Sequence, residues 1–230
     1  MRIVIFGANG QTGRLVTRRA LDAGHTAVAV TRNPGGFPFA DPRLEVVGAD
    51  VRDAPAVVTA VDGADAVLST LGVPFSMRPI DTYSAGIGNV IAAMQKTSVR
   101  RLVVVSSSGT THYPNRVDPP FALRIFEPIL TRTIGKTTYD DQRRMEAIVR
   151  DSELHWTIVH PSGLFDLPNV TEYIAGEVDP VGGFTSRTDL ADYLVSLASR
   201  SGRADTVTIS TTTDTPTLWQ MVRREAFKSA

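Results

Sequence analysis

The first thirteen residues constrain the fold of this chain more than any other stretch. Ile3–Phe6 form a continuous apolar run, which is typical of a strand buried on both faces of a parallel sheet. Gly7, Gly10 and Gly13 follow at once, and helical spacing of apolar residues begins directly behind them. A strand, a glycine turn and a helix in this order predict an α/β fold whose first turn can approach a pyrophosphate closely.

The glycine spacing in this turn is Gly-x-x-Gly-x-x-Gly rather than the commoner Gly-x-Gly-x-x-Gly. Such a triplet alone is also typical of an ordinary surface turn. The strand before it and the helix behind it favour dinucleotide binding, because a helix N-terminus offers free N–H groups and a positive dipole end to phosphates. Gly24 is expected to end that helix.

Apolar runs and helical patterns then alternate along the chain. This alternation predicts a single domain with a doubly wound, mostly parallel sheet and helices on both of its faces. Further strands are expected at 26–31, 44–47, 66–71, 102–105, 156–159 and 206–210. Helices are expected behind Asp53 as N-cap and at 82–96, 138–151, 189–198 and 218–227. Ligands bind at the carboxyl ends of the strands in such sheets. The residues expected to line one crevice there are 7–13, 31–32, 50–51, 71–72 and 106–108.

The alternation loosens beyond residue 110. We expect 110–136 and 165–185 to form a small substrate-side lobe on the same domain, the second of them mobile because it is rich in glycine, proline and polar residues. The apolar stretch 121–134 is compatible with a core helix or with a flap over the crevice. Thr138 and Asp141 resemble a capping box at the start of a helix.

The end of the second strand bears on the choice of dinucleotide. NAD-binding folds usually place a carboxylate there for the ribose, whereas this chain has Thr31 and Arg32. A guanidinium pairs with a phosphate through two hydrogen bonds and a carboxylate would repel it, so NADP(H) is the expected cofactor. The alternative is that Arg32 is an exposed loop arginine. Arg14 either adds to the phosphate site or is solvated.

The charge and cysteine content exclude some partners and chemistries. The 24 basic and 24 acidic residues balance, so no global field attracts nucleic acid or an anionic membrane. The absence of cysteine excludes disulfides and thiolate chemistry and fits a reducing cytosol. We expect a cytoplasmic protein without a signal peptide or membrane span, because no apolar run approaches the ~20 residues that a bilayer requires.

Hydride transfer depends mainly on geometry, because the cofactor carries the chemistry, and a nearby proton donor can assist it. The four histidines lack metal-ligand spacing, so no metal site is expected. His160, at the end of a strand, could reach the crevice or be turned into the sheet by strand alternation. Ser106–Ser108 follow a central strand and are better placed for the nicotinamide, unless they bond only to the loop backbone.

Tyr139 and Arg143 invite comparison with the Tyr-x-x-x-Lys dyad of short-chain dehydrogenases. Arg143 carries a fixed charge but cannot relay a proton. Asp140 and Asp141 beside the tyrosine would hinder its ionisation. Tyr139 is therefore a candidate proton donor that competes with solvent, and the dyad itself is disfavoured.

Six segments, spread over nearly the whole chain, carry the motifs of a known family. They are Ile5–Gly13, Gly48–Val51, Asp65–Gly72, Gly88–Met94, Tyr139–Met145 and Trp156–Pro161. In combination they resemble the atypical short-chain dehydrogenase/reductases, and within that group the family of biliverdin-IXβ reductase/flavin reductase and its NmrA-like relatives.

This resemblance implies an NADP(H)-dependent reductase, monomeric or weakly dimeric, that passes hydride to a flat conjugated acceptor without a tyrosine–lysine dyad. It places Arg32 at the 2′-phosphate and Ser107 near the nicotinamide and the substrate. The residues that it implies at the pyrophosphate are Gly7, Asn9, Gly10, Gln11, Thr12 and Gly13. The residues that it implies elsewhere along the cofactor are Asp50, Val51, Leu71, Gly72, Ser106, Pro161, Ser162 and Gly163.

Departures from the family pattern leave the substrate open. The family's histidine after the proline pair of the sixth strand is Gly163 here, and Ser162 replaces the second proline. Its histidine in the helix after the fifth strand is Gln142. The apolar stretch 121–134 is also longer than in the flavin reductase.

The expected function is NADPH-dependent reduction of a flavin, a quinone or another conjugated small molecule, with Ser107 and Tyr139 as candidate catalytic residues. The alternative is an NmrA-like sensor that binds NADP(H) to regulate a partner and performs no chemistry. An epimerase or dehydratase of sugar nucleotides is disfavoured by the short C-terminal half and by the missing lysine.

Overall fold

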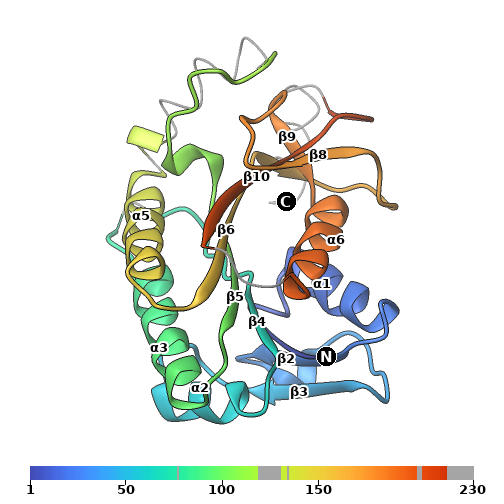
Figure 1. Cartoon of the computed structure of the whole chain (residues 1–230), viewed down its shortest axis with the longest axis vertical. Coiled ribbons are helices and arrows are strands. Elements are labelled where there is room, and N and C mark those ends of the chain that lie inside the picture. Colours follow the sequence, from blue (N-terminus) through green and yellow to red (C-terminus); the bar gives the residue numbers. More distant parts are fainter. Residues whose placement is uncertain (77, 119–130, 134, 201–203, 217–230) are drawn as a thin grey trace.

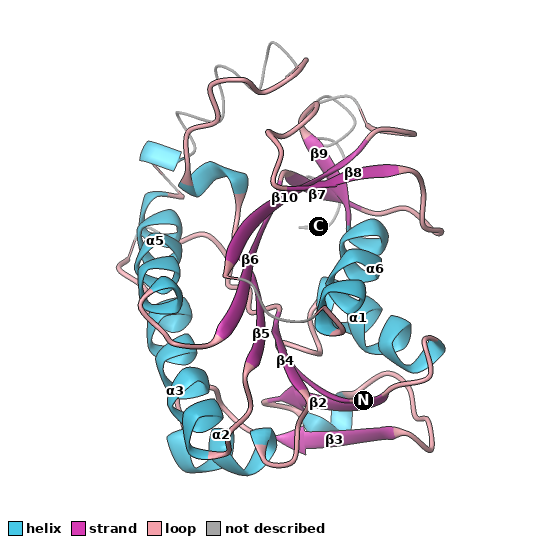
Figure 2. Ribbon diagram, viewed as in Figure 1, coloured by secondary structure: helices cyan, strands magenta, loops and turns pink. Residues whose placement is uncertain are grey.

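A mostly parallel sheet forms the centre of the molecule. The computed structural model describes residues 1–76, 78–118, 131–133, 135–200 and 204–216. Within these ranges an eight-stranded sheet has the order β3-β2-β1-β4-β5-β6-β10-β8, and a small second sheet pairs β7 with β9 (Figures 1 and 2). The strands are β1 Arg2–Phe6, β2 Thr26–Thr31, β3 Leu44–Gly48, β4 Ala66–Ser69, β5 Arg101–Val105, β6 His155–Pro161, β7 Gly163–Phe165, β8 Tyr173–Gly176, β9 Phe184–Ser186 and β10 Asp205–Thr211. Neighbouring strands of the main sheet are parallel except β8, which runs antiparallel to β10.

Helices cover both faces of this sheet. They are α1 Gln11–Asp22, α2 Ala54–Val61, α3 Thr82–Lys96, α5 Lys136–Arg150 and α6 Arg187–Ala198, with the short 3-10 helices η1 Pro34–Gly36 and η2 Ser108–Thr110. Figure 1 shows α2, α3 and α5 on one side of the sheet and α1 and α6 on the other. This arrangement confirms the predicted doubly wound, mostly parallel fold. No helix in the described part of the chain is long and apolar enough to cross a membrane.

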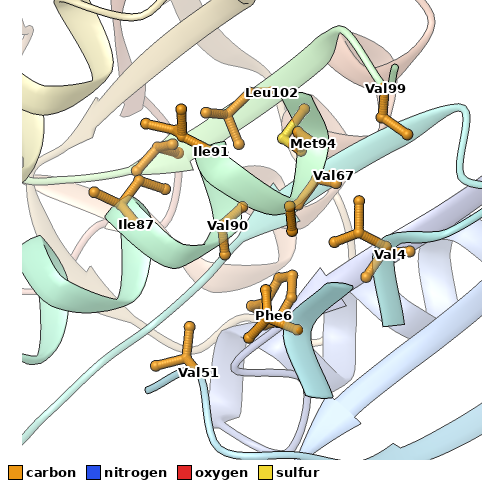
Figure 3. Packing of buried hydrophobic residues seen from close by; sticks show 14 of the residues in the cluster. Val4, Phe6, Val51, Val67, Ile87, Val90, Ile91, Met94, Val99 and Leu102 are labelled. Carbon is orange, nitrogen blue, oxygen red and sulfur yellow. The ribbon is translucent and has the colours of Figure 1, made fainter. Parts of the chain in front are cut away.

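Alternate residues of β1 belong to two separate hydrophobic cores. Val4 and Phe6 face α2, α3 and α5, in the cluster that also holds Ile87 and Met94 of α3 (Figure 3). The other two residues of the run Ile3–Phe6 belong to the cluster beneath α1 and α6. All four residues are at most 1% exposed, which explains why the run is continuously apolar rather than alternating.

Most expected elements are present, with ends shifted by a few residues. β4 ends at Ser69 rather than at residue 71, and β6 continues to Pro161. β7, β8 and β9 are additions to the expected set, because the glycines and prolines around these short strands favour loop in the sequence. The helix expected at 218–227 and most of the stretch 121–134 lie outside the described residues.

Hydrogen bonds join the segments that follow β5 and β8. Val117 N donates to the carbonyl oxygen of Pro180 at 3.1 Å, and Gly182 N donates to that of Val117 at 2.8 Å. These bonds connect parts of the stretches 110–136 and 165–185. The function of these stretches as a substrate-side lobe stays a prediction.

Local signals set several helix ends. Asp53 caps α2, as predicted, by accepting a hydrogen bond from Ala56 N at 3.2 Å. Gly24 follows α1 with a left-handed φ of 83°, as expected of a C-terminal stop. The predicted capping box at Thr138 is wrong, because α5 already begins at Lys136 and has no side-chain cap.

Asp141, the expected partner in that box, caps a different helix. Its Oδ2 accepts a hydrogen bond from Tyr83 N at 2.8 Å, at the start of α3. Its Oδ1 accepts from the Ser84 hydroxyl at 2.5 Å and from Arg144 at 3.1 Å. The carboxylate is fully buried, and two of its partners, Tyr83 and Ser84, come from a segment distant in the sequence.

We expect Asp141→Ala to lower the free energy of unfolding by about 2–4 kcal/mol, because it removes the cap of α3 and leaves a buried N–H without an acceptor. Urea denaturation measures this change. Asp140→Ala is the matched control: Asp140 is 35% exposed and pairs with Lys136 and Arg143, so the loss should stay below about 1 kcal/mol. Equal losses in the two variants would contradict the capping role.

Candidate functional site

The turn between β1 and α1 leaves room only for glycine at two positions. Gly7 has a left-handed φ of 75°, and a Cβ there would lie 2.6 Å from the carbonyl oxygen of Thr70. A Cβ on Gly13 would lie 2.2 Å from the carbonyl oxygen of Gly7. The turn therefore packs directly on the ends of β1 and β4, and any side chain at these positions would displace it.

The N-terminus of α1 is not capped by a side chain of its own. Gly10 is the N-cap residue, and the first turn holds no acidic residue. Arg14 N donates to the Gly10 carbonyl at 2.9 Å, so the amides before it have no acceptor within the helix. Free N–H groups and the positive helix end fit the pyrophosphate of a dinucleotide. Contacts of Asn9, Gln11 and Thr12 with that group stay predictions, and Arg14 itself is tied to Asn9 Oδ1 at 2.9 Å.

Arg32 stands at the carboxyl end of β2 with its side chain exposed. The hydroxyl of Thr31 before it accepts a hydrogen bond from Asn33 N at 3.2 Å. Among the residues that the structure describes, Arg32 has neither a hydrogen bond nor an ion pair. Its guanidinium is therefore available to an anion, and its contact with a 2′-phosphate stays a prediction.

The side chains that follow β3 and β4 converge on α3. A Cβ on Gly86 would lie 2.9 Å from Val51 and 3.2 Å from Leu71, so glycine in the helix lets both approach. Asp50 and Gly72, their neighbours in sequence, are exposed. The structure thus brings together Val51 and Leu71, two of the residues predicted to lie along the cofactor, at the edge where the strands end.

Ser107 bonds to its own loop. Its Oγ accepts a hydrogen bond from Gly109 N at 3.2 Å and caps η2. Arg143 donates to the carbonyl oxygens of Thr110 at 3.1 Å and Gly109 at 3.5 Å, and pairs with Asp140. Arg143 therefore supports the loop that carries Ser107. The role of Ser107 at the nicotinamide stays a prediction.

Tyr139 lies against the same loop. A Cβ on Gly109 would lie 2.7 Å from the Tyr139 ring. The ring of Phe75, which is 50% exposed, has its centroid 6.2 Å from that of Tyr139 and is tilted by 34°. An aromatic pair therefore borders the loop that carries Ser107.

A buried carboxylate of α5, that of Glu146, binds both ends of the loop that carries Ser107. Glu146 is 3% exposed, and its Oε1 accepts hydrogen bonds from the hydroxyls of Ser106 at 2.5 Å and Thr110 at 2.7 Å. Arg150 donates to Oε2 at 2.8 Å, and Nε2 of His160 lies 3.0 Å from Oε1. The hydroxyl of Ser106 is thus engaged with Glu146, and its contact with the cofactor stays a prediction.

These partners hold Glu146 in its ionised form. Burial alone would raise the pKa of this carboxyl. The hydrogen bond from His160 and its charge, followed by the bonds from Ser106 and Thr110, outweigh burial and lower the pKa to about 2.

His160 is turned into the layer between β6 and α5, which settles the alternative that the sequence leaves open. It is fully buried, on the same face as Ile158 two residues earlier. Its Nδ1 lies 2.5 Å from the hydroxyl of Tyr113, while its Nε2 bonds to Glu146. Strand alternation therefore decides the direction of this side chain.

Glu146 and Tyr113 are the residues of this network that sequence reasoning missed. A signal existed for Glu146, because Gln142, Met145, Glu146 and Val149 share helical spacing and all lie on the buried face. Tyr113 lies in a polar segment where no periodicity indicates the direction of its side chain.

Pro161, Ser162 and Gly163 lie where β6 passes into β7. The Ser162 hydroxyl accepts a hydrogen bond from Arg116 at 3.3 Å, and Ser162 N donates to the Thr185 hydroxyl at 3.0 Å. These bonds fix the chain at the carboxyl end of β6. Its contact with the cofactor stays a prediction.

We expect Glu146→Gln to destabilise the protein at neutral pH and to flatten the dependence of its stability on pH. The folded-state pKa lies below the ordinary value of 4.5, so the carboxylate stabilises the fold above about pH 4.5 and this contribution is lost as the pH falls toward about 2. The loss at neutral pH should be about 3 kcal/mol, measured by urea denaturation from neutral to acid pH. Glu153 is exposed and follows the C-terminus of α5, so Glu153→Gln should leave the dependence of stability on pH as it is in the parent protein.

Comparison with known proteins identifies the family. The pattern of the NAD(P)H-binding family matches residues 7–201 of this chain. A short-chain dehydrogenase/reductase from Veillonella parvula, solved in complex with NADP, superposes with a TM-score of 0.76 at 19% identity, over 94% of this chain and 99% of that one. ChuY from Escherichia coli O157:H7, described as an anaerobillin reductase, superposes with a TM-score of 0.72 at 20% identity, over 94% and 100%. At these identities the likeness concerns the fold.

Curated relatives align over shorter stretches. The (4-alkanoyl-5-oxo-2,5-dihydrofuran-3-yl)methyl phosphate reductase of Streptomyces griseus is 32% identical over 159 residues, which cover 69% of this chain and 46% of that protein. An uncharacterized protein of Mycobacterium tuberculosis is 38% identical over 108 residues, which cover 46% of this chain and 12% of that protein. The chain thus spans less than half of the length of these relatives. Since the family match covers most of the chain and the glycine turn has the geometry that a dinucleotide requires, the chain belongs to the NAD(P)H-binding family.

Proposed function

We propose that this chain is an NADPH-dependent reductase that transfers hydride to a flavin, a quinone or another conjugated small molecule. The observation that carries the proposal is the uncapped N-terminus of α1 behind Gly7 and Gly13, on the sheet edge where Arg32 offers a guanidinium that pairs with none of the described residues. When bound, the dinucleotide supplies the hydride. The chain has to hold it and to keep the acceptor against it.

The preference for NADPH rests on charge at the end of β2. No carboxylate stands at Thr31 or Arg32 to hold ribose hydroxyls, and none is there to repel a phosphate. The exposed guanidinium of Arg32 suits a 2′-phosphate through two parallel hydrogen bonds.

The preference for a flat acceptor rests on the aromatic pair beside the Ser107 loop. Phe75 is half exposed, and Tyr139, in the first turn of α5, lies against Gly109. Aromatic faces favour stacking with a conjugated ring system. Two similar proteins, the (4-alkanoyl-5-oxo-2,5-dihydrofuran-3-yl)methyl phosphate reductase and the anaerobillin reductase named above, bear names that are consistent with reduction of conjugated acceptors.

One observation favours the alternative of an NADP(H) sensor without catalysis. Position 143 holds arginine rather than the lysine of the usual tyrosine–lysine dyad, and its guanidinium donates to the carbonyl oxygens of Gly109 and Thr110. A sensor needs only the dinucleotide site. Turnover therefore decides between the two functions.

We expect the protein to oxidise NADPH in the presence of at least one member of a panel of FMN, quinones and biliverdin. Absorbance of the reduced nicotinamide measures this, with NADH as the control for cofactor choice and calorimetry as the measure of NADPH binding. Tight NADPH binding without turnover of any acceptor would overturn the reductase and favour the sensor.

We expect Arg32→Ala to reduce the preference for NADPH over NADH at least tenfold, about 1.4 kcal/mol, because the 2′-phosphate loses its cation. The ratio of the two dissociation constants measures this. Arg100→Ala removes the same charge just before β5, at the opposite edge of the sheet, and should leave the ratio unchanged. An unchanged ratio in Arg32→Ala would contradict the phosphate assignment.

A further inference from the structure

We infer that Tyr113 is the proton donor of the proposed reduction and that His160, positioned by Glu146, returns a proton to it. The inference rests on the proposed function and adds to it a catalytic residue that differs from Tyr139. It is carried by two hydrogen bonds that connect Tyr113 to His160 and His160 to Glu146, three residues from separate segments of the protein.

These hydrogen bonds lead from Tyr113, a partly buried residue, to the buried carboxylate of Glu146. Tyr113 Oη lies 2.5 Å from Nδ1 of His160, and Nε2 of His160 lies 3.0 Å from Oε1 of Glu146. The tyrosine and imidazole rings meet edge to face, with centroids 6.1 Å apart and an interplanar angle of 86°. His160 is fully buried and Glu146 is 3% exposed, so Tyr113 is the member with access to another molecule.

The ionised carboxylate fixes where the imidazole protons lie. Glu146 can only accept, so Nε2 of His160 has to carry a hydrogen. When His160 is neutral, its Nδ1 accepts the hydroxyl proton of Tyr113. When His160 is protonated, Nδ1–H donates to the tyrosine oxygen, and the hydroxyl proton is free to point toward another acceptor. The protonation of His160 thus decides whether Tyr113 can donate outward.

The hydroxyl lies at the edge of the sheet where the cofactor site lies. Tyr113 follows η2 at the carboxyl end of β5, and His160 stands at the carboxyl end of the neighbouring strand β6. Arg116 fastens the segment of Tyr113 to this edge, through Ser162 Oγ at 3.3 Å and the carbonyl oxygen of Gly182 at 3.0 Å. In parallel sheets this edge is where ligands bind.

The relay balances protons and electrons. The acceptor gains a hydride, which brings two electrons and leaves a negative charge on it. The O–H bond of Tyr113 then breaks as a new bond from that hydrogen to the acceptor forms. The Nδ1–H bond of His160 breaks as the O–H bond of Tyr113 is restored, and the neutral imidazole takes up a proton from water. The net change consumes one NADPH, one acceptor and one proton.

The surroundings of Tyr113 explain why His160 has to return a proton to the tyrosine after it has donated its own. Burial, followed by the charges of Glu146 and Asp179, raises the pKa of Tyr113 to about 12, although the charge of Arg150 opposes them. A tyrosinate left at this position would therefore be unfavourable, and a proton from His160 removes it. Among the described residues, the charged groups that act on Tyr113 are Glu146 and Arg150 of α5 and Asp179 of the adjoining loop.

The direct test is Tyr113→Phe, which keeps the ring and removes the hydroxyl. With FMN or a quinone as acceptor, the single-turnover rate of NADPH oxidation should fall on the order of 100-fold, while the dissociation constant of NADPH stays unchanged. The parent rate should show a solvent deuterium isotope effect, and this effect should vanish in the variant. Tyr193→Phe, in α6 on the opposite face of the sheet, is the matched control and should behave as the parent.

A second readout needs no cofactor. In protein with isotopically labelled imidazole nitrogens, magnetic resonance should find Nε2 of His160 protonated, and Tyr113→Phe should shift the Nδ1 resonance. An unprotonated Nε2, or an Nδ1 resonance unmoved by the variant, would overturn the relay whatever the activity.

The kinetic outcomes separate this inference from the proposed function. Tight NADPH binding with no turnover in the parent overturns the proposed function, and the relay falls with it. Turnover that Tyr113→Phe leaves undiminished overturns the relay alone. A comparable loss in Tyr139→Phe, with Tyr113→Phe active, assigns the donor to Tyr139 and also overturns the relay.

Discussion

The contact between Gly13 and the carbonyl of Gly7 positions the first helix on the sheet. A methyl group at either glycine would meet backbone atoms at 2.6 Å or less, and backbone cannot move aside as a flexible side chain can. With glycine there, α1 buries Val16, Ala20 and Leu21 in the core shared with α6. The first amides of α1 have no acceptor within the helix, and Gly10 as N-cap has no side chain to supply one, so the turn that packs α1 on the sheet also leaves room for an anion.

Buried carboxylates tie the remaining layers together. Asp141 links α5 to the start of α3, and Glu146 links α5 to the ends of β5 and β6. Asp189, also fully buried, accepts from the backbone and the hydroxyl of Thr171 and from the hydroxyl of Thr211, which joins α6 to β10 and to the segment before β8. Each carboxylate has several donors, which is the condition for burying a charge without a large loss of stability.

Residues whose roles depend on near neighbours were predictable. Asp53 caps the helix that begins one residue later, and Gly24 ends the helix before it. Roles that depend on distant partners were not. The spacing from Thr138 to Asp141 suggested a capping box, yet the carboxylate caps α3. The sequence disfavoured Arg143 as part of a dyad but did not indicate its partners, which are the carbonyl oxygens of the Ser107 loop.

The sequence by itself determined the parallel α/β fold and the dinucleotide turn, because the run Ile3–Phe6, the glycines behind it and the helical spacing that follows act within a few residues of one another. Only the tertiary structure decided that His160 points into the layer beneath α5, between Tyr113 and Glu146. Alternation along a strand offers two faces, and which face meets a carboxylate depends on how a helix from elsewhere in the chain packs against it.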